Sequence, residues 1–160
     1  MTKDAVKGQE KSKTRRLDLP RDGYRILIVD DERSIRDLFL MVISCGLPDC
    51  SIDVAVNGAE AVVAFRQARP SVLVMDLKMP VMDGGQAFEE IEKLCKTQSW
   101  TMPSVIFCTG FAPPDRIQNL IKDNPIHCLL RKPVSPKQLM EAIRKRLPGA
   151  GSSGEDVLSL

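Results

Sequence analysis

An unbroken apolar run that ends in a single carboxylate constrains this chain more than any other sequence feature. Residues 72–75 read Val-Leu-Val-Met, Asp76 follows directly, and a turn sequence, Pro-Val-Met-Asp-Gly, begins at Pro80. A continuous apolar run of this length predicts a strand buried on both faces, as in a parallel sheet. Asp76 would then be the first residue able to leave a central strand at its carboxyl end, where open α/β sheets place their ligand crevices.

Size and composition narrow the classes of protein to which the chain can belong. Its 160 residues suit a single domain with short extensions. The apolar fraction of 43% is ordinary for a globular protein, and a net charge of +2 is too small to indicate nucleic-acid binding. No run approaches the length of a membrane span, so we expect no membrane partner, and no secretory signal is visible. The five cysteines form no C-x-x-C pair, which predicts reduced thiols in a cytoplasmic protein.

Apolar periodicity predicts five strands that alternate with five helices. The strands are expected at 24–29, 51–56, 72–76, 103–108 and 126–130. Asn57 with Glu60, and Ser135 with Pro136, predict the starts of two helices. Gly46 is expected to end the first helix. This alternation predicts an α/β fold in which helices cover both faces of a parallel sheet.

The apolar patterns of the strands also predict their order in the sheet. The strand at 51–56 begins with alternating polar and apolar residues, which suits an edge, whereas the first, third and fourth strands are apolar and belong inside. The order 2-1-3-4-5 of a doubly wound (βα)5 sheet meets both conditions. Its switch point lies between strands 1 and 3, where Asp30, Asp31 and Asp76 would emerge together.

Three carboxylates at one edge of a sheet repel one another and call for a cation. Mg²⁺ suits Asp30, Asp31 and Asp76, because it accepts one or two carboxylates, keeps water ligands and leaves a place for a phosphate oxygen, with Mn²⁺ as an alternative. Lys132 would bring an ammonium group to this edge and Thr109 a hydroxyl. These groups together are what transfer of a phosphoryl group onto Asp76 requires.

Four short motifs at the expected strand ends carry a resemblance to a known family. They are Asp30-Asp31-Glu32, Asp76-Leu-Lys-Met-Pro80 with Asp83-Gly84, Thr109-Gly110 and Lys132-Pro133. Each motif is weak alone, but in this order the chain resembles the receiver domain of two-component response regulators, of the single-domain, chemotaxis-regulator-like kind. The resemblance implies a flavodoxin-like fold. We expect the receiver domain at 23–148, a polar and basic leader at 1–22 and a flexible tail at 149–160.

The resemblance implies a phosphoacceptor and a metal site. Asp76 would accept the phosphoryl group, and Asp30 and Asp31 would be the acids of the Mg²⁺ site. Asp31, Asp76 and the backbone carbonyl of Lys78 would bind the ion directly. The side chain of Lys78 would either be solvated or affect the lifetime of the phosphoryl group.

The resemblance also implies a switch, and here the sequence departs from the family pattern. Thr109 would move toward the phosphoryl group, and Lys132 would bind it ahead of a cis peptide bond to Pro133. Leu129 stands three residues before the lysine, where the family usually has an aromatic residue or His as a rotamer switch. The resemblance therefore supports phosphorylation of Asp76 more firmly than it supports a signal passed on through an aromatic residue at position 129.

The expected function is that of a response regulator. A sensor histidine kinase or a histidine phosphotransfer protein would donate the phosphoryl group, and the protein would catalyse only its own phosphorylation and dephosphorylation. Its output would be contact with a downstream protein that the sequence does not specify, or a phosphorylation-dependent dimer. A phosphorelay intermediate, which passes the group on to a histidine phosphotransfer protein, is the alternative.

Other function classes fit less well. A phosphatase of the haloacid-dehalogenase kind needs a second Asp where Lys78 stands, and a flavodoxin-like cofactor binder needs Ser, Thr or Gly where Asp30 and Asp31 stand. His127, the only histidine, is expected to be structural within the last strand. Phe111, Leu129 and Val134 are candidates for an exposed contact patch, with core packing as the alternative for Leu129.

Overall fold

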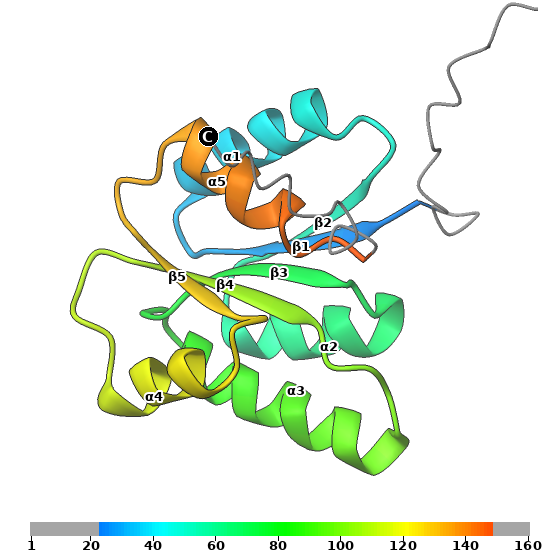
Figure 1. The fold of residues 1–160 in the computed structure, drawn as a ribbon, viewed down its shortest axis with the longest axis vertical. Helices are drawn as coiled ribbons and strands as arrows, with labels where there is room; N and C mark the ends of the chain where they lie inside the picture. Colours follow the sequence, from blue (N-terminus) through cyan, green and yellow to red (C-terminus); the bar gives the residue numbers. More distant parts are fainter. Residues whose placement is uncertain (1–22, 149–160) are drawn as a thin grey trace, which may run out of the picture.

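A computed structural model describes residues 23–148, and the leader and tail predicted at 1–22 and 149–160 lie outside these residues (Figure 1). The strands are β1 (Arg25–Val29), β2 (Ser51–Ala55), β3 (Val72–Asp76), β4 (Ser104–Thr109) and β5 (Cys128–Arg131). The helices are α1 (Arg33–Gly46), α2 (Gly58–Ala68), α3 (Gly84–Gln98), α4 (Asp115–Asp123) and α5 (Pro136–Arg144). None of these helices has the length and apolar character needed to cross a membrane.

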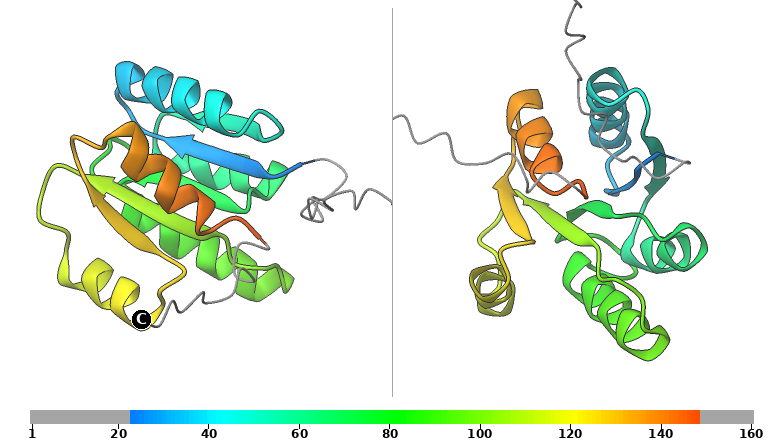
Figure 2. Two further views of the ribbon diagram at one scale, coloured as in Figure 1. Left: turned by 45° about the horizontal axis from the view of Figure 1, so that its top comes forward. Right: turned by 45° about the vertical axis from the view of Figure 1, so that its right-hand side comes forward.

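All strands are parallel and lie in the order β2-β1-β3-β4-β5, which confirms the predicted topology. Helices α1 and α5 cover one face of the sheet, and α2, α3 and α4 lie on the other (Figure 2). In the ladders Val29 pairs with Met75, and Asp76 pairs with Cys108. The carboxyl ends of β1, β3 and β4 therefore meet at one edge of the sheet.

The core has two layers, one on each face of the sheet. The layer beside α2, α3 and α4 includes Leu27, Leu73, Met75, Phe107 and Ile117. The layer beside α1 and α5 includes Ile26, Ile28, Val74, Ile106 and Leu139. Because successive strand residues point to opposite faces, two covered faces require an apolar residue at every position. This explains the unbroken apolar run of β3, all of which is buried.

Strand β1 begins one residue later than predicted, and β2 and β5 are also shorter than predicted, because local hydrogen bonds take up the backbone groups at their ends. The prediction continued β2 through Val56, but the amide of Val56 donates to the Glu60 carboxylate at 3.0 Å. The prediction began β5 at Ile126, but Asn124 forms a turn there and accepts from the amides of Ile126 and His127. His127 thus lies just before β5 and not within it.

Side-chain caps mark where α2, α3 and α5 begin. Asn57 accepts from the Glu60 amide at the start of α2. Because the Glu60 side chain bonds Val56 and not Asn57, the predicted reciprocal box is displaced by one residue. Ser135 and Gln138 form a complete capping box at α5.

The two ends of the described domain lie close together. The Tyr24 hydroxyl donates to the carbonyl oxygen of Pro148, so β1 begins where the segment after α5 finishes. The start of β1 and the segment after α5 lie at the amino ends of the strands, opposite the carboxyl edge of the sheet (Figure 2).

Candidate functional site

Three carboxylates converge where β1 and β3 end. Asp30, Asp31 and Asp76 each offer one oxygen, and these oxygens all lie within 4.8 Å of one another. Asp30 and Asp76 are buried, whereas Asp31 is exposed to solvent. Carboxylate oxygens grouped in this way form a donor set that suits a hard divalent cation such as Mg²⁺.

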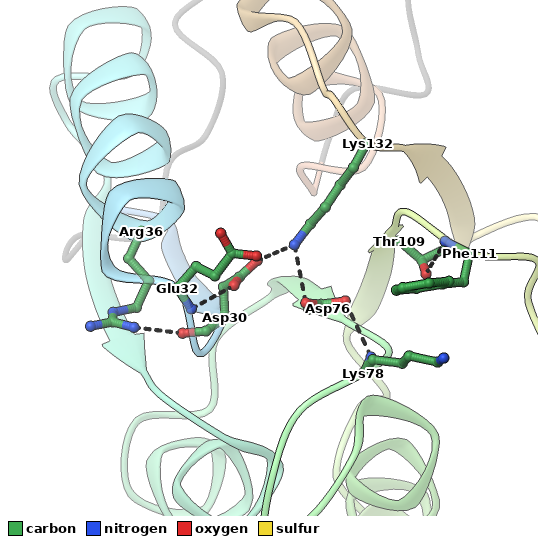
Figure 3. Close-up of polar contacts among 8 residues, drawn as sticks. All are labelled: Asp30, Glu32, Arg36, Asp76, Lys78, Thr109, Phe111 and Lys132. Carbon is green, nitrogen blue, oxygen red and sulfur yellow. Dashed lines mark hydrogen bonds and ion pairs between the residues drawn. The ribbon is translucent and has the colours of Figure 1, made fainter.

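Lys132 bridges the two buried carboxylates. Its Nζ donates to Asp30 Oδ2 at 2.7 Å and to Asp76 Oδ2 at 3.0 Å (Figure 3). Burial acts to lower the pKa of Lys132, but its bonds to Asp30 and Asp76 outweigh burial and raise it above the ordinary value. Burial raises the pKa of Asp76, although Lys132 acts in the opposite direction. One ammonium therefore offsets only part of the cost of burying two carboxylates.

Backbone contacts hold the acids in place. The Glu32 amide donates to Asp30 Oδ1 at 2.9 Å, and the Lys78 amide donates to Asp76 Oδ1 at 3.2 Å (Figure 3). Gly84 begins α3 so close to β3 that a Cβ there would overlap the carbonyl oxygen of Asp76. The glycine of the Asp83-Gly84 motif is therefore required by close approach of backbone to backbone.

Thr109 lies at the end of β4, on the other side of Asp76 from Asp30 (Figure 3). Its side chain is buried, and its Oγ1 accepts from the Phe111 amide at 3.2 Å. The Phe111 ring lies 3.8 Å from Lys78 Nζ, measured to the ring centroid. Sequence reasoning missed this contact, although Lys78 and Phe111 each stand two residues after a site residue, Asp76 and Thr109.

The remaining residues singled out in the sequence lie outside this cluster. Leu129 is partly buried in β5 and packs on the core layer beside α4. Val134 is buried beside α5, so it does not join the exposed patch predicted with Phe111. His127 is 2% exposed, and its Nδ1 accepts from the Val105 amide at 3.0 Å, which is a structural role. The peptide bond before Pro133 is cis.

A doubly wound sheet with acids and a lysine at its carboxyl edge is typical of the signalling domains of two-component systems. The family model described as the response regulator receiver domain matches residues 26–144. The chain belongs to this family, and its fold is the flavodoxin-like receiver fold that the sequence predicted. Receiver domains bind Mg²⁺ at an acidic pocket and interact with histidine kinases and downstream effectors.

Several relatives show what the chain is similar to. It is 29% identical over 123 residues to the chemotaxis protein CheY of Thermotoga maritima, which covers 77% of this chain and 97% of that protein. It is 41% identical over 83 residues to a protein-glutamate methylesterase/protein-glutamine glutaminase of Aliivibrio fischeri, covering 52% of this chain. The chain spans only 22% of that methylesterase.

Solved structures show the same fold. A two component transcriptional regulator AraC from Clostridium phytofermentans superposes with a TM-score of 0.65 at 34% identity, over 78% of this chain and 92% of that one. The chemotaxis protein CheY4 of Vibrio cholerae superposes with a TM-score of 0.63 at 25% identity, over 78% of this chain and 98% of that one. The chain is therefore a receiver domain of the CheY-like kind.

Proposed function

We propose that the domain at 23–148 accepts a phosphoryl group on Asp76 from a phosphohistidine donor, in a Mg²⁺-dependent reaction, and signals by protein–protein contact. The observation that carries this proposal is the position of the Asp76 carboxylate, 3.0 Å from the Lys132 ammonium and grouped with Asp30 and Asp31. A sensor histidine kinase or a histidine phosphotransfer protein is the donor, and the protein catalyses only its own phosphorylation and dephosphorylation.

Asp76 acts as the nucleophile. Its oxygen forms a bond to phosphorus while the phosphorus–nitrogen bond of the donor breaks, and the leaving imidazole keeps the electron pair and takes up a proton. Lys132 then shares its Nζ between Asp30 and a phosphoryl oxygen, and the Thr109 hydroxyl donates to another. No separate base is needed, because a carboxylate attacks in its ionised form.

Asp31, Asp76 and the carbonyl of Lys78 are the groups proposed to hold Mg²⁺, with Asp30 beside them. When bound, Mg²⁺ supplies positive charge that neutralises the acids and the phosphoryl oxygens. Asp31 is the exposed member of the cluster and lies where an ion can enter from solvent.

Intact-mass measurement tests the proposal. Wild type and Asp76→Asn are incubated with acetyl phosphate, with and without Mg²⁺, and their masses are followed in time. A gain of one phosphoryl group only in wild type, and only with Mg²⁺, is expected. A gain that persists in Asp76→Asn would place the modification elsewhere and contradict the proposal.

The second candidate is a phosphorelay intermediate, and Leu129 is the observation that favours it. Without an aromatic switch at that position, passing the group to a histidine phosphotransfer protein requires less rearrangement than opening a new surface. A short phosphoryl lifetime and rapid transfer to such a protein would support the relay, whereas a long lifetime would support the switch.

We also propose a cytoplasmic location, because all five cysteines are free thiols, which fits a reducing compartment.

A further inference from the structure

Phe111 is an exposed aromatic residue with two polar contacts, one made by its backbone amide and one by its ring. Its side chain is 57% exposed, although it is large and apolar. Its amide donates to Thr109 Oγ1, and the Lys78 ammonium lies over its ring at 3.8 Å from the centroid (Figure 3). The Thr109 contact is local, because Thr109 ends β4 and Phe111 follows in the next loop, whereas the Lys78 contact reaches across from the loop after β3. The ring of Phe111 therefore joins the loops on either side of the site.

Phe111 lines one side of a mostly apolar cavity, to which Lys78, Asp83 and Thr109 also contribute. The cavity has a volume of about 570 Å³ and is bounded by the same two loops and by the first turns of α3 and α4. Its apolar lining includes Leu77, Met79, Pro80, Pro114 and Ile117. Cavities of about 300–1,000 Å³ hold whole small molecules, so this one has room for a phenyl ring. Moving the ring inward would remove apolar surface from water, which favours the move.

Both contacts of Phe111 involve groups that a phosphoryl group on Asp76 would attract. A phosphoryl group adds nearly two negative charges and three strong acceptor oxygens. Lys78 is adjacent, since its amide already donates to Asp76 Oδ1 at 3.2 Å, and its ammonium would turn toward the new charge. Thr109 would turn its hydroxyl in the same direction. The ring would then lose its cation and its amide would lose its acceptor in one event.

We propose that Phe111 is the aromatic readout residue of this chain, and that phosphorylation moves its ring from solvent into the adjacent cavity. This role rests on the proposed phosphorylation of Asp76. It also accounts for Leu129, because a chain that reads out through the loop after β4 does not need an aromatic residue in β5. The surface that changes for a partner is then that loop, with Phe111 withdrawn from it.

The test uses tryptophan at position 111 as a reporter. Trp100 is the only tryptophan, so Phe111→Trp in a Trp100→Phe background has a single emitting residue. Leu129→Trp in the same background is the matched control at the family's usual position. Each chain is treated with acetyl phosphate and Mg²⁺, and phosphorylation is followed by intact mass in the same samples.

Phosphorylation is expected to shift the emission of Phe111→Trp to shorter wavelength. Quenching by acrylamide should fall about twofold or more, because a ring that is more than half exposed becomes buried. The emission of Leu129→Trp should stay constant. A mass gain without a change at position 111, or a change only at position 129, overturns the inference while leaving phosphorylation of Asp76 intact. If wild type gains no mass, the proposed function fails, and this role of Phe111 fails with it.

Two further measurements keep the inference testable if the reporter chain does not accept the phosphoryl group. Fluorophenylalanine at the five Phe positions of the wild-type chain gives ¹⁹F NMR resonances, and the resonance that is missing in Phe111→Leu belongs to the ring at position 111. That resonance then follows the surroundings of the ring. In the reporter chain, Lys78→Met should lower acrylamide quenching before any phosphorylation, and Lys78→Arg should restore it. If Lys78→Met leaves quenching unchanged, Lys78 does not hold the ring and the inference is wrong.

Discussion

The two ends of the sheet handle charge in opposite ways. At the carboxyl end, Asp30 and Asp76 are buried with one ammonium between them, and Val81 of the adjoining loop has a φ of 71°. At the amino end, the Arg69 guanidinium stacks on Trp100 at 4.4 Å, and His127 accepts a backbone hydrogen bond in its neutral form. The carboxyl end keeps charge that a bound ligand can neutralise, and at the amino end the charged and ring groups of Arg69 and His127 are engaged by the protein itself. Left-handed backbone occurs at both ends, at Val81 on the carboxyl side and at Arg69 and Ser99 on the amino side.

The largest effect is expected from removing the single cation of the carboxyl end. Lys132→Met would leave Asp30 and Asp76 buried without a cation, which should cost about 3 kcal/mol of unfolding free energy in urea titrations without Mg²⁺. Phosphorylation by acetyl phosphate should slow roughly 100-fold or more, because a group that stabilises the transferring oxygens is lost. Lys137→Met, at an exposed lysine in the first turn of α5, is the control and should change stability by less than about 0.5 kcal/mol. Equal losses in both variants would contradict the bridging role.

The amino end should respond to pH through His127. Burial and then the nearby Arg146 lower the pKa of His127 from 6.5 to about 4, while Glu92 acts weakly in the opposite direction. In the unfolded chain His127 takes up a proton near pH 6.5, whereas in the folded chain it does not. The contribution of His127 to stability is therefore fully present above pH 6.5. It should fall by up to about 3 kcal/mol as the pH drops toward 4.

Asparagine at position 127 can accept from the Val105 amide but does not titrate in this range. His127→Asn should therefore be less stable than wild type at neutral pH, yet lose less stability between pH 6.5 and 4. Urea midpoints across this range measure the difference. Parallel pH curves for the two chains would show that acid acts elsewhere.

Removing a charge from the carboxyl end should stabilise the fold while abolishing its chemistry. The pKa of Asp76 is raised, mainly by burial, so its charge opposes folding at neutral pH, and that cost declines as the pH falls through the raised pKa. Asp76→Asn should gain about 1–2 kcal/mol in thermal or urea unfolding without Mg²⁺. Asp123→Asn, at an exposed acid of α4, is the control and should change little. A less stable Asp76→Asn would show that its bond to Lys132 outweighs burial.

The smallest effect is expected from the strained loop. Val81 is β-branched, 84% exposed and in the left-handed region, a conformation that costs about 1–2 kcal/mol for an L-residue. Val81→Gly should raise the unfolding free energy by about 1 kcal/mol or less, since glycine also adds freedom to the unfolded chain. Val63→Gly, at an exposed valine inside α2, should lower it by a similar amount. The opposite signs distinguish relief of strain from a general effect of glycine.

The sequence predicted those features of the fold and the site that depend on the periodicity of apolar residues. Buried parallel strands must be apolar at every position, so the runs before Asp30 and Asp76 disclosed both the sheet and the edge at which the acids meet. The contact between Lys78 and Phe111 could not be predicted in this way. It depends on the rotamers of two side chains and on the separation of two loops, and neither leaves a periodic pattern.

The position of His127 just before β5 does not follow from periodicity either. Its sequence neighbours are apolar and suggest a strand, but the Asn124 turn removes residue 126 and His127 from the ladder. The burial of Val134 likewise depends on how the segment before α5 returns to the sheet, which apolar spacing does not record.

The hydrogen bond from Tyr24 to Pro148 has a consequence for how such a domain is built into longer chains. Because the polypeptide enters and leaves at one place, on the side away from Asp76, additional modules can be attached at either end without covering the acidic edge. A module joined there would communicate with the site only through the sheet and helices, or by swinging around the domain on its tether. This geometry suits a unit that makes up nearly all of one relative, the CheY of Thermotoga maritima, and about a fifth of another, the methylesterase of Aliivibrio fischeri.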